Sequence, residues 1–340
     1  MTDRPLRWGV LGTANIARKA VIPAIHASTG NELVAVASRD PERSERFAAD
    51  VGAARSHGSY VSLLADDQVE ALYLPLPNAL HAEWTVRALE AGKHVLCEKP
   101  LAASPAECRR MYAAADTAGL QLMEAFMYRH HPRTQRLVEL VHAGVLGDVR
   151  WLHACFSFTV GDATNIRLNA ALAGGALMDV GCYGVDVARA IVGEEPSMAQ
   201  AHAITTPSGV DETLVGSLLF PGGVVATIAC SLAAVRTESV EVIGTEGRLR
   251  VTRAFLPGHD ACEALLERED GEIERLDFEG VDQYRLMIEA FERSVRSGEL
   301  PSLGQDGAMN LRAIDGLYAS VHAGGSLVPL SAVDTGSSSA

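Results

Sequence analysis

Three short stretches of the sequence place charged or hydroxyl-bearing side chains where chemistry could occur. Residues 75–81 and 98–100 each follow an apolar run of strand length directly. In open α/β sheets, ligands bind beyond the carboxyl ends of the strands. A third stretch holds Asp179, Tyr183 and Asp186 at spacings of four and three residues, which puts them on one face of a helix. These stretches are the candidates for a catalytic site.

The turn at residues 12–16 is predicted to bind the phosphates of a dinucleotide. An apolar run over residues 6–11 ends in small residues, and a helical pattern begins at once. Small side chains let backbone N–H groups approach a pyrophosphate, and the helix N-terminus adds partial positive charge. The fingerprint positions hold Gly12, Ala14 and Ala17, so the pattern is degraded and an ordinary turn is the alternative. The residues expected to contact the cofactor are Gly12, Thr13, Ala14, Asn15 and Ile16.

The residues at the end of the next apolar run, 32–38, indicate whether the cofactor is NADP(H) or NAD(H). An NAD site usually has an acidic residue there, which accepts hydrogen bonds from the ribose hydroxyls. This sequence has the neutral Ser38 and then Arg39, whose guanidinium suits a phosphate, and Arg43 lies one helical turn further. We therefore expect NADP(H), with NAD(H) less favoured. The alternative is that Arg39 pairs with Asp40 or Glu42 on an exposed helix.

Residues 1–125 are predicted to form a doubly wound α/β domain that binds a dinucleotide. Short apolar runs alternate with helical patterns, which is typical of a parallel sheet covered on both faces. A proline at position 23 is expected to kink the first helix. The expected strands are 6–11, 32–38, 71–74, 94–97 and 121–125, and the expected helices are 15–28, 41–50, 81–91 and 104–118.

Residues 126–303 are predicted to form an α+β domain with a large, mainly antiparallel, open-faced sheet. The expected strands are 149–159, 198–205, 213–220, 224–232, 238–243 and 248–251, with a helix over 176–192 before most of them. Both faces of the 224–232 strand are almost free of charge. Its outer face is therefore expected to contact either another subunit or the chain's own helices.

The end of the chain is predicted to be helical and then disordered. Helices are expected over 282–297 and 305–323, and both are expected to pack back on the first domain, although the domain division assigns only residues 304–325 to this role. Residues 331–340 are rich in small polar residues and are expected to form a disordered tail.

Composition argues against several classes of partner. The net charge of −14 disfavours nucleic acid and anionic membranes. No secretory signal and no apolar stretch of spanning length stands out. The six cysteines form no C-x-x-C pair, which predicts reduced thiols and a cytoplasmic protein. Adjacent His130 and His131 would point to different faces of a helix, so we expect no metal site.

The sequence resembles the Gfo/Idh/MocA oxidoreductase family over about residues 6–325. The resemblance is carried by Glu-Lys-Pro at 98–100, Glu-Ala-Phe-Met-Tyr-Arg at 124–129, and the segment 175–183. Many members have histidine where this chain has Tyr183. Tyrosine is the pattern of the branch that includes glucose–fructose oxidoreductase, dimeric dihydrodiol dehydrogenase and NADP-dependent xylose dehydrogenase.

The resemblance implies that Lys99 and Tyr183 are the catalytic pair, with Asp179 supporting them, and that the Lys99–Pro100 bond can be cis. A lysine ammonium close to a phenol favours the phenolate and lowers the phenol's pKa toward neutrality. The alternatives are that Lys99 is a surface lysine and Tyr183 a core tyrosine. The remaining implied cofactor residues are Leu76, Pro77, Asn78, His81 and Glu98, with Lys99 itself, and the implied substrate residues are Arg129, Asn165 and Arg167.

These observations predict an NADP(H)-dependent oxidoreductase for a sugar-like, polyhydroxylated substrate or a cyclic diol or carbonyl compound. One alternative is a nucleotide-sugar ketoreductase of the same family. An alternative of another class is a sensor or scaffold that binds NADP without catalysis. We also expect a homodimer or homotetramer formed through the open sheet face.

Overall fold

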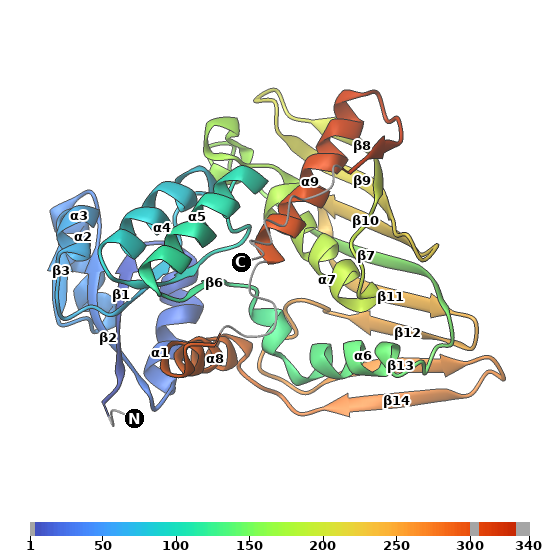
Figure 1. Cartoon of the computed structure of the whole chain (residues 1–340), viewed down its shortest axis with the longest axis horizontal. Helices are drawn as coiled ribbons and strands as arrows, with labels where there is room; N and C mark the ends of the chain where they lie inside the picture. Colours follow the sequence, from blue (N-terminus) through green and yellow to red (C-terminus); the bar gives the residue numbers. More distant parts are fainter. Residues whose placement is uncertain (1–3, 300–305, 331–340) are drawn as a thin grey trace, which may run out of the picture.

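The computed structural model describes residues 4–299 and 306–330, which contain two sheets side by side (Figure 1). The first sheet is parallel and has the order β3-β2-β1-β4-β5-β6. Its central strands are apolar and buried, because helices cover both faces. The doubly wound fold is thereby confirmed. The strands are β1 (Leu6–Leu11), β2 (Asn31–Ala37), β3 (Arg55–His57), β4 (Ala71–Leu74), β5 (His94–Cys97) and β6 (Leu122–Glu124).

The helices of this domain begin and end at residues with known capping preferences. Asp40 and Ser104 accept hydrogen bonds at two N-termini, and Gly52 and Gly119 end the same helices in the left-handed conformation. The elements are η1 (Ala17–Val21), α1 (Ile22–Ala27), α2 (Pro41–Val51), α3 (Tyr60–Leu64), η2 (Asn78–Leu80), α4 (His81–Glu90) and α5 (Pro105–Ala118).

Three local features differ from the sequence expectation. The first helix is divided into a π-helical turn and α1, with Pro23 near the start of α1, where the missing N–H is least costly. Strand β3 and helix α3 were not predicted, because they have only three and five residues and β3 carries no apolar side chain.

The second sheet has nine strands in the order β14-β13-β12-β11-β7-β10-β9-β8-β15. It is mixed rather than fully antiparallel, because β10 pairs with β7 in parallel. Tight turns join two antiparallel hairpins, between β9 and β10 and between β11 and β12. The strands are β7 (Val149–Thr159), β8 (Met198–Thr205), β9 (Asp211–Leu219), β10 (Val225–Ser231), β11 (Ala233–Gly244), β12 (Gly247–Thr252), β13 (Cys262–Arg268), β14 (Ile273–Phe278) and β15 (Val328–Pro329).

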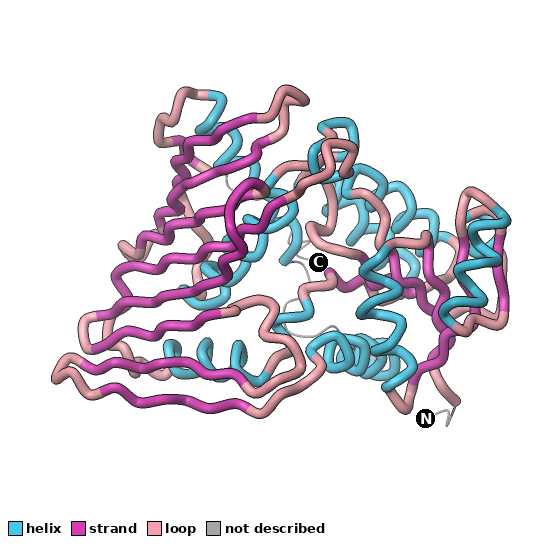
Figure 2. Tube along the Cα trace, turned by 180° about the vertical axis from the view of Figure 1, so that it is seen from behind, coloured by secondary structure: helices cyan, strands magenta, loops and turns pink. Residues whose placement is uncertain are grey.

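Helices α6 (Pro132–His142), α7 (Cys182–Val192) and α9 (Asp306–His322) lie on one face of this sheet (Figure 1). Residues of β10 that face α7, such as Ile228, are fully buried. On the other face, Trp151 and Val215 are exposed, and none of the described helices covers them (Figure 2). The expectation that the chain's own helices cover this face is therefore wrong for the described residues.

The last two helices connect the domains. Helix α8 (Gln283–Ser297) contacts η1 and α1, and its Phe291 ring lies 5.1 Å from the Trp8 ring. It therefore packs on the first domain, although the division at residue 303 assigned it to the second. Helix α9 contacts α5 of the first domain, as expected, and also α7 and β8 of the second. The predicted tail at 331–340 and residues 304–305 lie outside the described residues.

The segment Ala170–Val192, which ends in α7, is long and apolar enough to span a membrane by length and composition. No apolar stretch of this length was expected from the sequence. Two thirds of its apolar window, 67%, is buried inside the protein, as in a core helix packed against a sheet.

Candidate active site

A cavity of about 680 Å³ lies between the two domains. Its first wall is formed by the turns after β1, β4 and β5, where parallel strands present their carboxyl ends. Its second wall comes from the inner face of β7, the loop before α7, and α7 itself. Side chains far apart in sequence therefore share one chamber, and Lys99 and Tyr183 are both among them.

Lys99 and Asp179 are bonded across the domain boundary. The Lys99 Nζ donates to the Asp179 backbone oxygen at 2.7 Å and lies 3.5 Å from Oδ1, while Arg167 Nε donates to Oδ2 at 2.6 Å. Burial alone would raise the pKa of Asp179, but Lys99 and Arg167 outweigh it and lower that pKa. Burial likewise opposes the charge on Lys99, yet Asp179 raises its pKa. At neutral pH the three groups are therefore charged.

Tyr183 stands at the first turn of α7 among aromatic rings. The Phe126 and Phe156 rings lie 5.2 and 5.4 Å from its ring. Among the described residues, its hydroxyl donates only to the Met127 sulfur, at 3.6 Å. Lys99 Nζ lies 4.9 Å from its ring centroid. Sulfur is a weak acceptor, so the hydroxyl retains hydrogen-bonding capacity toward the cavity.

The expectation that Lys99 lowers the pKa of Tyr183 is not met in this structure. Burial raises that pKa well above its ordinary value, and the nearby Tyr284 and Glu98 add to the effect. The ammonium is directed at Asp179 and lies over the ring rather than beside the hydroxyl. A phenol in this setting keeps its proton, and so begins as a proton donor.

Most of the predicted cofactor residues line the cavity. They are Thr13, Ala14, Asn15, Ile16, Arg43, Leu76, Pro77, Asn78, Glu98 and Lys99. Gly12 adopts φ 110°, where an added Cβ would lie 3.1 Å from Leu76. The first fingerprint position therefore needs glycine for both conformation and space.

Four predicted cofactor residues lie outside the cavity lining: Gly12, Ser38, Arg39 and His81. Ser38 is buried and its hydroxyl accepts from the backbone N–H of Asp40. Arg39 is exposed, and its side chain forms no ion pair with the described residues. His81 is fully buried, and its ring nitrogens contact the carbonyl oxygens of Leu76 and Pro100 at 2.7 and 2.9 Å.

His81 therefore links the turn after β4 to the loop after β5. Burial lowers the pKa of its ring, and the contacts with the two carbonyl oxygens partly offset this. The neighbouring Lys99–Pro100 peptide is cis, as the resemblance implied.

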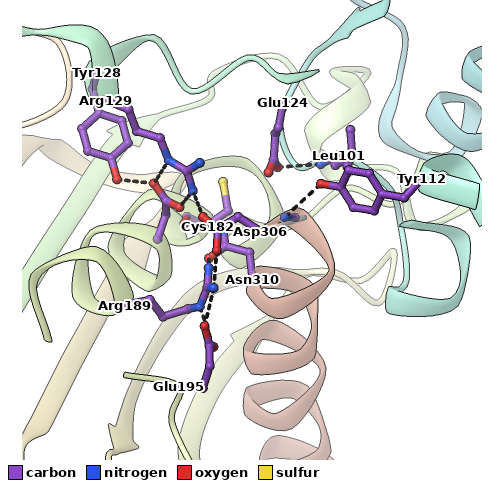
Figure 3. A network of polar contacts seen from close by, with 12 residues as sticks. Leu101, Tyr112, Glu124, Tyr128, Arg129, Cys182, Arg189, Glu195, Asp306 and Asn310 are labelled. Atoms are coloured by element: carbon purple, nitrogen blue, oxygen red, sulfur yellow. Dashed lines mark hydrogen bonds and ion pairs between the residues drawn. The ribbon is translucent and has the colours of Figure 1, made fainter. Parts of the chain in front are cut away.

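Asn165 and Arg167, which were expected to contact the substrate, line the cavity, whereas Arg129 does not. Figure 3 shows the Arg129 guanidinium beside Asp306, the first residue of α9. Arg129 also donates to Asp186 of α7. Asp186 also accepts from the Tyr128 hydroxyl. Asp179 and Tyr183 line the cavity but Asp186 does not, so the three side chains do not share one face of a helix. Asp179 lies in the π-helical turn η6 (Leu177–Gly181), and the extra residue of this turn rotates the helix before α7 begins.

Several side chains that line the cavity were not predicted. Phe156 and Phe158 could have been found by alternation in β7, which places them on the inner face with Leu152 and Ala154. Met127 lies within the 124–129 motif but received no role, and no local motif marks the others, which come from loops, from β11 and from α8. The missed lining residues include Met127, Phe156, Phe158, Thr164, Arg236, Leu256 and Tyr284.

Comparison with known proteins identifies the family. Residues 6–126 match the family described as "Oxidoreductase family, NAD-binding Rossmann fold", and residues 134–250 match the "GFO/IDH/MocA C-terminal domain". The chain is 42% identical over 321 residues to "D-xylose 1-dehydrogenase (NADP(+)) 2" of Haloferax volcanii, which covers 94% of this chain and 98% of the relative. The chain belongs to the Gfo/Idh/MocA family.

Solved structures of this family share its architecture. KijD10, a 3-ketoreductase from Actinomadura kijaniata solved with NADP and TDP-benzene, has a TM-score of 0.88 at 34% identity and covers 93% of this chain and 98% of its own. An aldose-aldose oxidoreductase from Caulobacter crescentus has a TM-score of 0.88 at 30% identity and covers 96% of this chain and 100% of its own.

No metal centre is apparent in this Gfo/Idh/MocA protein. Among residues 4–299 and 306–330, no group of three or more histidine, cysteine or acidic side chains could hold an ion. The adjacent histidines have separate environments: His131 Nδ1 accepts from the backbone N–H of Arg133 at the start of α6, and burial lowers the pKa of His130 to about 4.

Proposed function

We propose that the protein is an NADP(H)-dependent oxidoreductase that transfers hydride between the nicotinamide and a sugar-like, polyhydroxylated substrate or a cyclic diol or carbonyl compound. The observation that carries the proposal is the meeting of Lys99, Asp179 and Tyr183 in one cavity beside the dinucleotide turn. The bound cofactor supplies or accepts the hydride. The chain's own residues supply the proton and the electrostatic setting.

Tyr183 is the proposed general acid and base. Its buried hydroxyl keeps its proton until a substrate oxygen gains charge during reduction, and then donates it. Lys99 remains positive and stabilises the charge on that oxygen or on the phenolate. Asp179 holds the ammonium in place, and Arg167 holds Asp179 from the other side. The loss of one group should therefore affect the others.

The arginines beside the cofactor wall support NADP(H). Arg43 lines the cavity, and Arg39 stands exposed at the end of β2 without an ion pair among the described residues. Two planar guanidinium groups fit a 2′-phosphate. The strand ends in the neutral Ser38 and not in the acidic residue that binds the ribose hydroxyls in an NAD site. The NADP-dependent xylose dehydrogenase and the NADP complex of KijD10 support the same choice.

A panel assay tests the function. Purified protein is mixed with NADPH and aldoses, ketoses or dicarbonyl compounds, and the loss of NADPH absorbance is followed; NADP+ with aldoses and diols tests the reverse direction. Turnover with one of these classes is expected. Binding of NADPH without turnover on any substrate would favour the sensor or scaffold instead.

A nucleotide-sugar ketoreductase is the second candidate. KijD10, a 3-ketoreductase, was solved with TDP-benzene, and Arg167 and Arg236 supply cations to the cavity of this chain. A nucleotide diphosphate could bind to such cations. Turnover on a dTDP-ketosugar that exceeds turnover on free sugars would select this candidate.

The uncovered sheet face is the proposed subunit interface. Trp151 and Val215 on β7 and β9 are exposed, and part-buried Thr227 and Ala229 lie between them on β10. Exposed apolar surface of this kind favours association as a homodimer or homotetramer. Val215→Asp should give a monomer in size-exclusion chromatography with light scattering. All six cysteines are free, which fits a reducing compartment such as the cytoplasm.

A further inference from the structure

A buried tyrosine lies behind the cofactor wall and is not part of the predicted site. Tyr73 is the third residue of β4 and is fully buried. Its hydroxyl donates to Oε1 of Glu98 at 2.6 Å. This is a short bond to a carboxylate, and such bonds are stronger than those between neutral groups.

The strand register explains why these two residues meet. Tyr73 pairs with Leu96 in the parallel β4–β5 ladder. Glu98 lies two residues beyond Leu96, so its side chain points to the same face of the sheet as Leu96 and Tyr73. The length of the phenol lets it reach past the end of the strand. Among the described residues, Glu98 accepts from Tyr73 through one oxygen and from the Lys99 backbone N–H through the other.

We propose that Tyr73 is a positioning residue that holds the Glu98 carboxylate at the cavity wall as the acceptor for the ribose hydroxyls of the cofactor. The inference rests on the proposed function, because it needs a dinucleotide in this cavity. Glu98 lines the cavity beside Lys99, whereas Tyr73 lies behind the wall and cannot touch a ligand. Its effect therefore passes through Glu98.

The charge of Glu98 depends on this contact. Burial raises the pKa of Glu98, whereas Lys99 and the Tyr73 hydroxyl lower it. Burial also raises the pKa of Tyr73 well above its ordinary value, so the phenol stays protonated and can donate. The other titratable or charged groups that act on Glu98 from the surrounding elements are Cys97, Lys99, Asp179, Arg167, Tyr183 and Tyr284.

Tyr73→Phe tests the proposal because it removes one oxygen and leaves the ring that fills the core. NADPH binding is followed by fluorescence titration from pH 5 to pH 9. We expect affinity at neutral pH to fall about tenfold, as for the loss of one hydrogen bond to a charged group. The pH at which NADPH binding is lost on acidification should rise by about one unit, because a carboxylate without its hydrogen-bond donor is protonated more easily.

Two variants separate positioning from a general loss of structure. Tyr112→Phe removes another buried phenol, which accepts from the Gly307 backbone N–H and forms no hydrogen bond with Glu98 among the described residues. The NADPH affinity of this variant should stay within twofold of wild type. Glu98→Gln cannot ionise, so adding Tyr73→Phe to it should leave the pH profile unchanged. If Tyr73→Phe had the same effect in wild type and in the Glu98→Gln variant, the proposal would be overturned.

An infrared pH titration of the protein without cofactor gives a second readout. The carboxyl band that disappears in Glu98→Gln should titrate at higher pH in Tyr73→Phe than in wild type. If this band titrated at the same pH in Tyr73→Phe and in wild type, the positioning role would be refuted even if NADPH binding were weakened. A third outcome is that the band shifts as expected but wild type binds no NADPH. The proposed function would then be wrong. The Tyr73–Glu98 contact would have no role in cofactor binding, so the inference would be overturned as well.

Discussion

The ammonium nitrogen of Lys99, at the end of β5, lies 4.9 Å from the centroid of the Tyr183 ring on α7. The two residues are separated by the domain boundary, and each is held by its own domain. Lys99 follows a buried strand and precedes a cis-proline, while Tyr183 is packed among Phe126, Phe156 and Phe255. Neither domain contains the proposed catalytic pair alone, so domain docking determines whether the site exists.

The first prediction concerns catalysis. Lys99→Ala and Tyr183→Phe should each lower kcat about 100-fold or more, which is the size of a general acid–base or electrostatic contribution. NADPH affinity should stay close to that of wild type in Tyr183→Phe, because Tyr183 belongs to the second wall of the cavity and not to the turns that are proposed to hold the cofactor. Stopped-flow turnover and fluorescence titration measure the two quantities separately. Full turnover in both variants would rule out the pair.

The second prediction concerns cofactor choice. Arg39→Ala removes an exposed guanidinium that forms no ion pair within the described chain, so no buried partner is left unpaired. If Arg39 binds the 2′-phosphate, the variant should lose about 10- to 100-fold in NADPH affinity and almost none in NADH affinity. Titration with both cofactors checks this. An equal loss for NADPH and NADH would contradict the assignment.

The parts of this molecule that were predictable from sequence are those with local patterns. Alternation of apolar runs and helices predicted the parallel sheet, and the stretches around Glu98 and Tyr183 predicted the two walls of the cavity. Arg129 was misplaced because its partners, Asp186 and Asp306, are 57 and 177 residues away, and nothing in its own segment indicates them. Tyr284 was missed for the same reason: only the packing of α8 on the first domain brings it to the cavity.

The third prediction concerns the network around Arg129. Its guanidinium contacts Asp186 and Asp306, and Arg189 connects Asp306 to Glu195, so three elements are fixed to one another (Figure 3). Arg129→Ala leaves the buried Asp186 without its cation and removes one of the two cations that contact Asp306. We therefore expect a loss of about 3–5 kcal/mol in the free energy of unfolding.

Urea denaturation measures this loss, and an exposed ion pair provides the control. Arg136→Ala breaks the contact with Glu139 on α6, where both side chains are more than half exposed. Such surface pairs contribute about 1 kcal/mol or less. Similar losses in the two variants would show that the buried network is no more important than a surface pair.

The last prediction follows from Glu124, a buried carboxyl group at the end of β6. Its Oε1 accepts from the Leu101 backbone N–H at 2.7 Å, while Oε2 has no hydrogen-bond partner among the described residues (Figure 3). Burial raises its pKa from 4.5 to about 7, and the nearby Arg129 only partly offsets this. The folded protein therefore holds a proton that the unfolded chain has already released between about pH 4.5 and pH 7.

Stability should consequently fall as pH rises through that window, because the folded state binds more protons than the unfolded state. The contribution of Glu124 is present below pH 4.5 and is lost by about pH 7, a change on the order of 3 kcal/mol. Glu124→Gln cannot ionise, so it should be more stable than wild type at pH 8 and nearly equal to it at pH 5. Glu90→Gln on the exposed face of α4 should show no such difference. Urea denaturation of all three proteins at both pH values measures these differences. If the stability difference between Glu124→Gln and wild type were the same at pH 5 and pH 8, Glu124 would already be ionised in the folded protein at pH 5, and the prediction would be wrong.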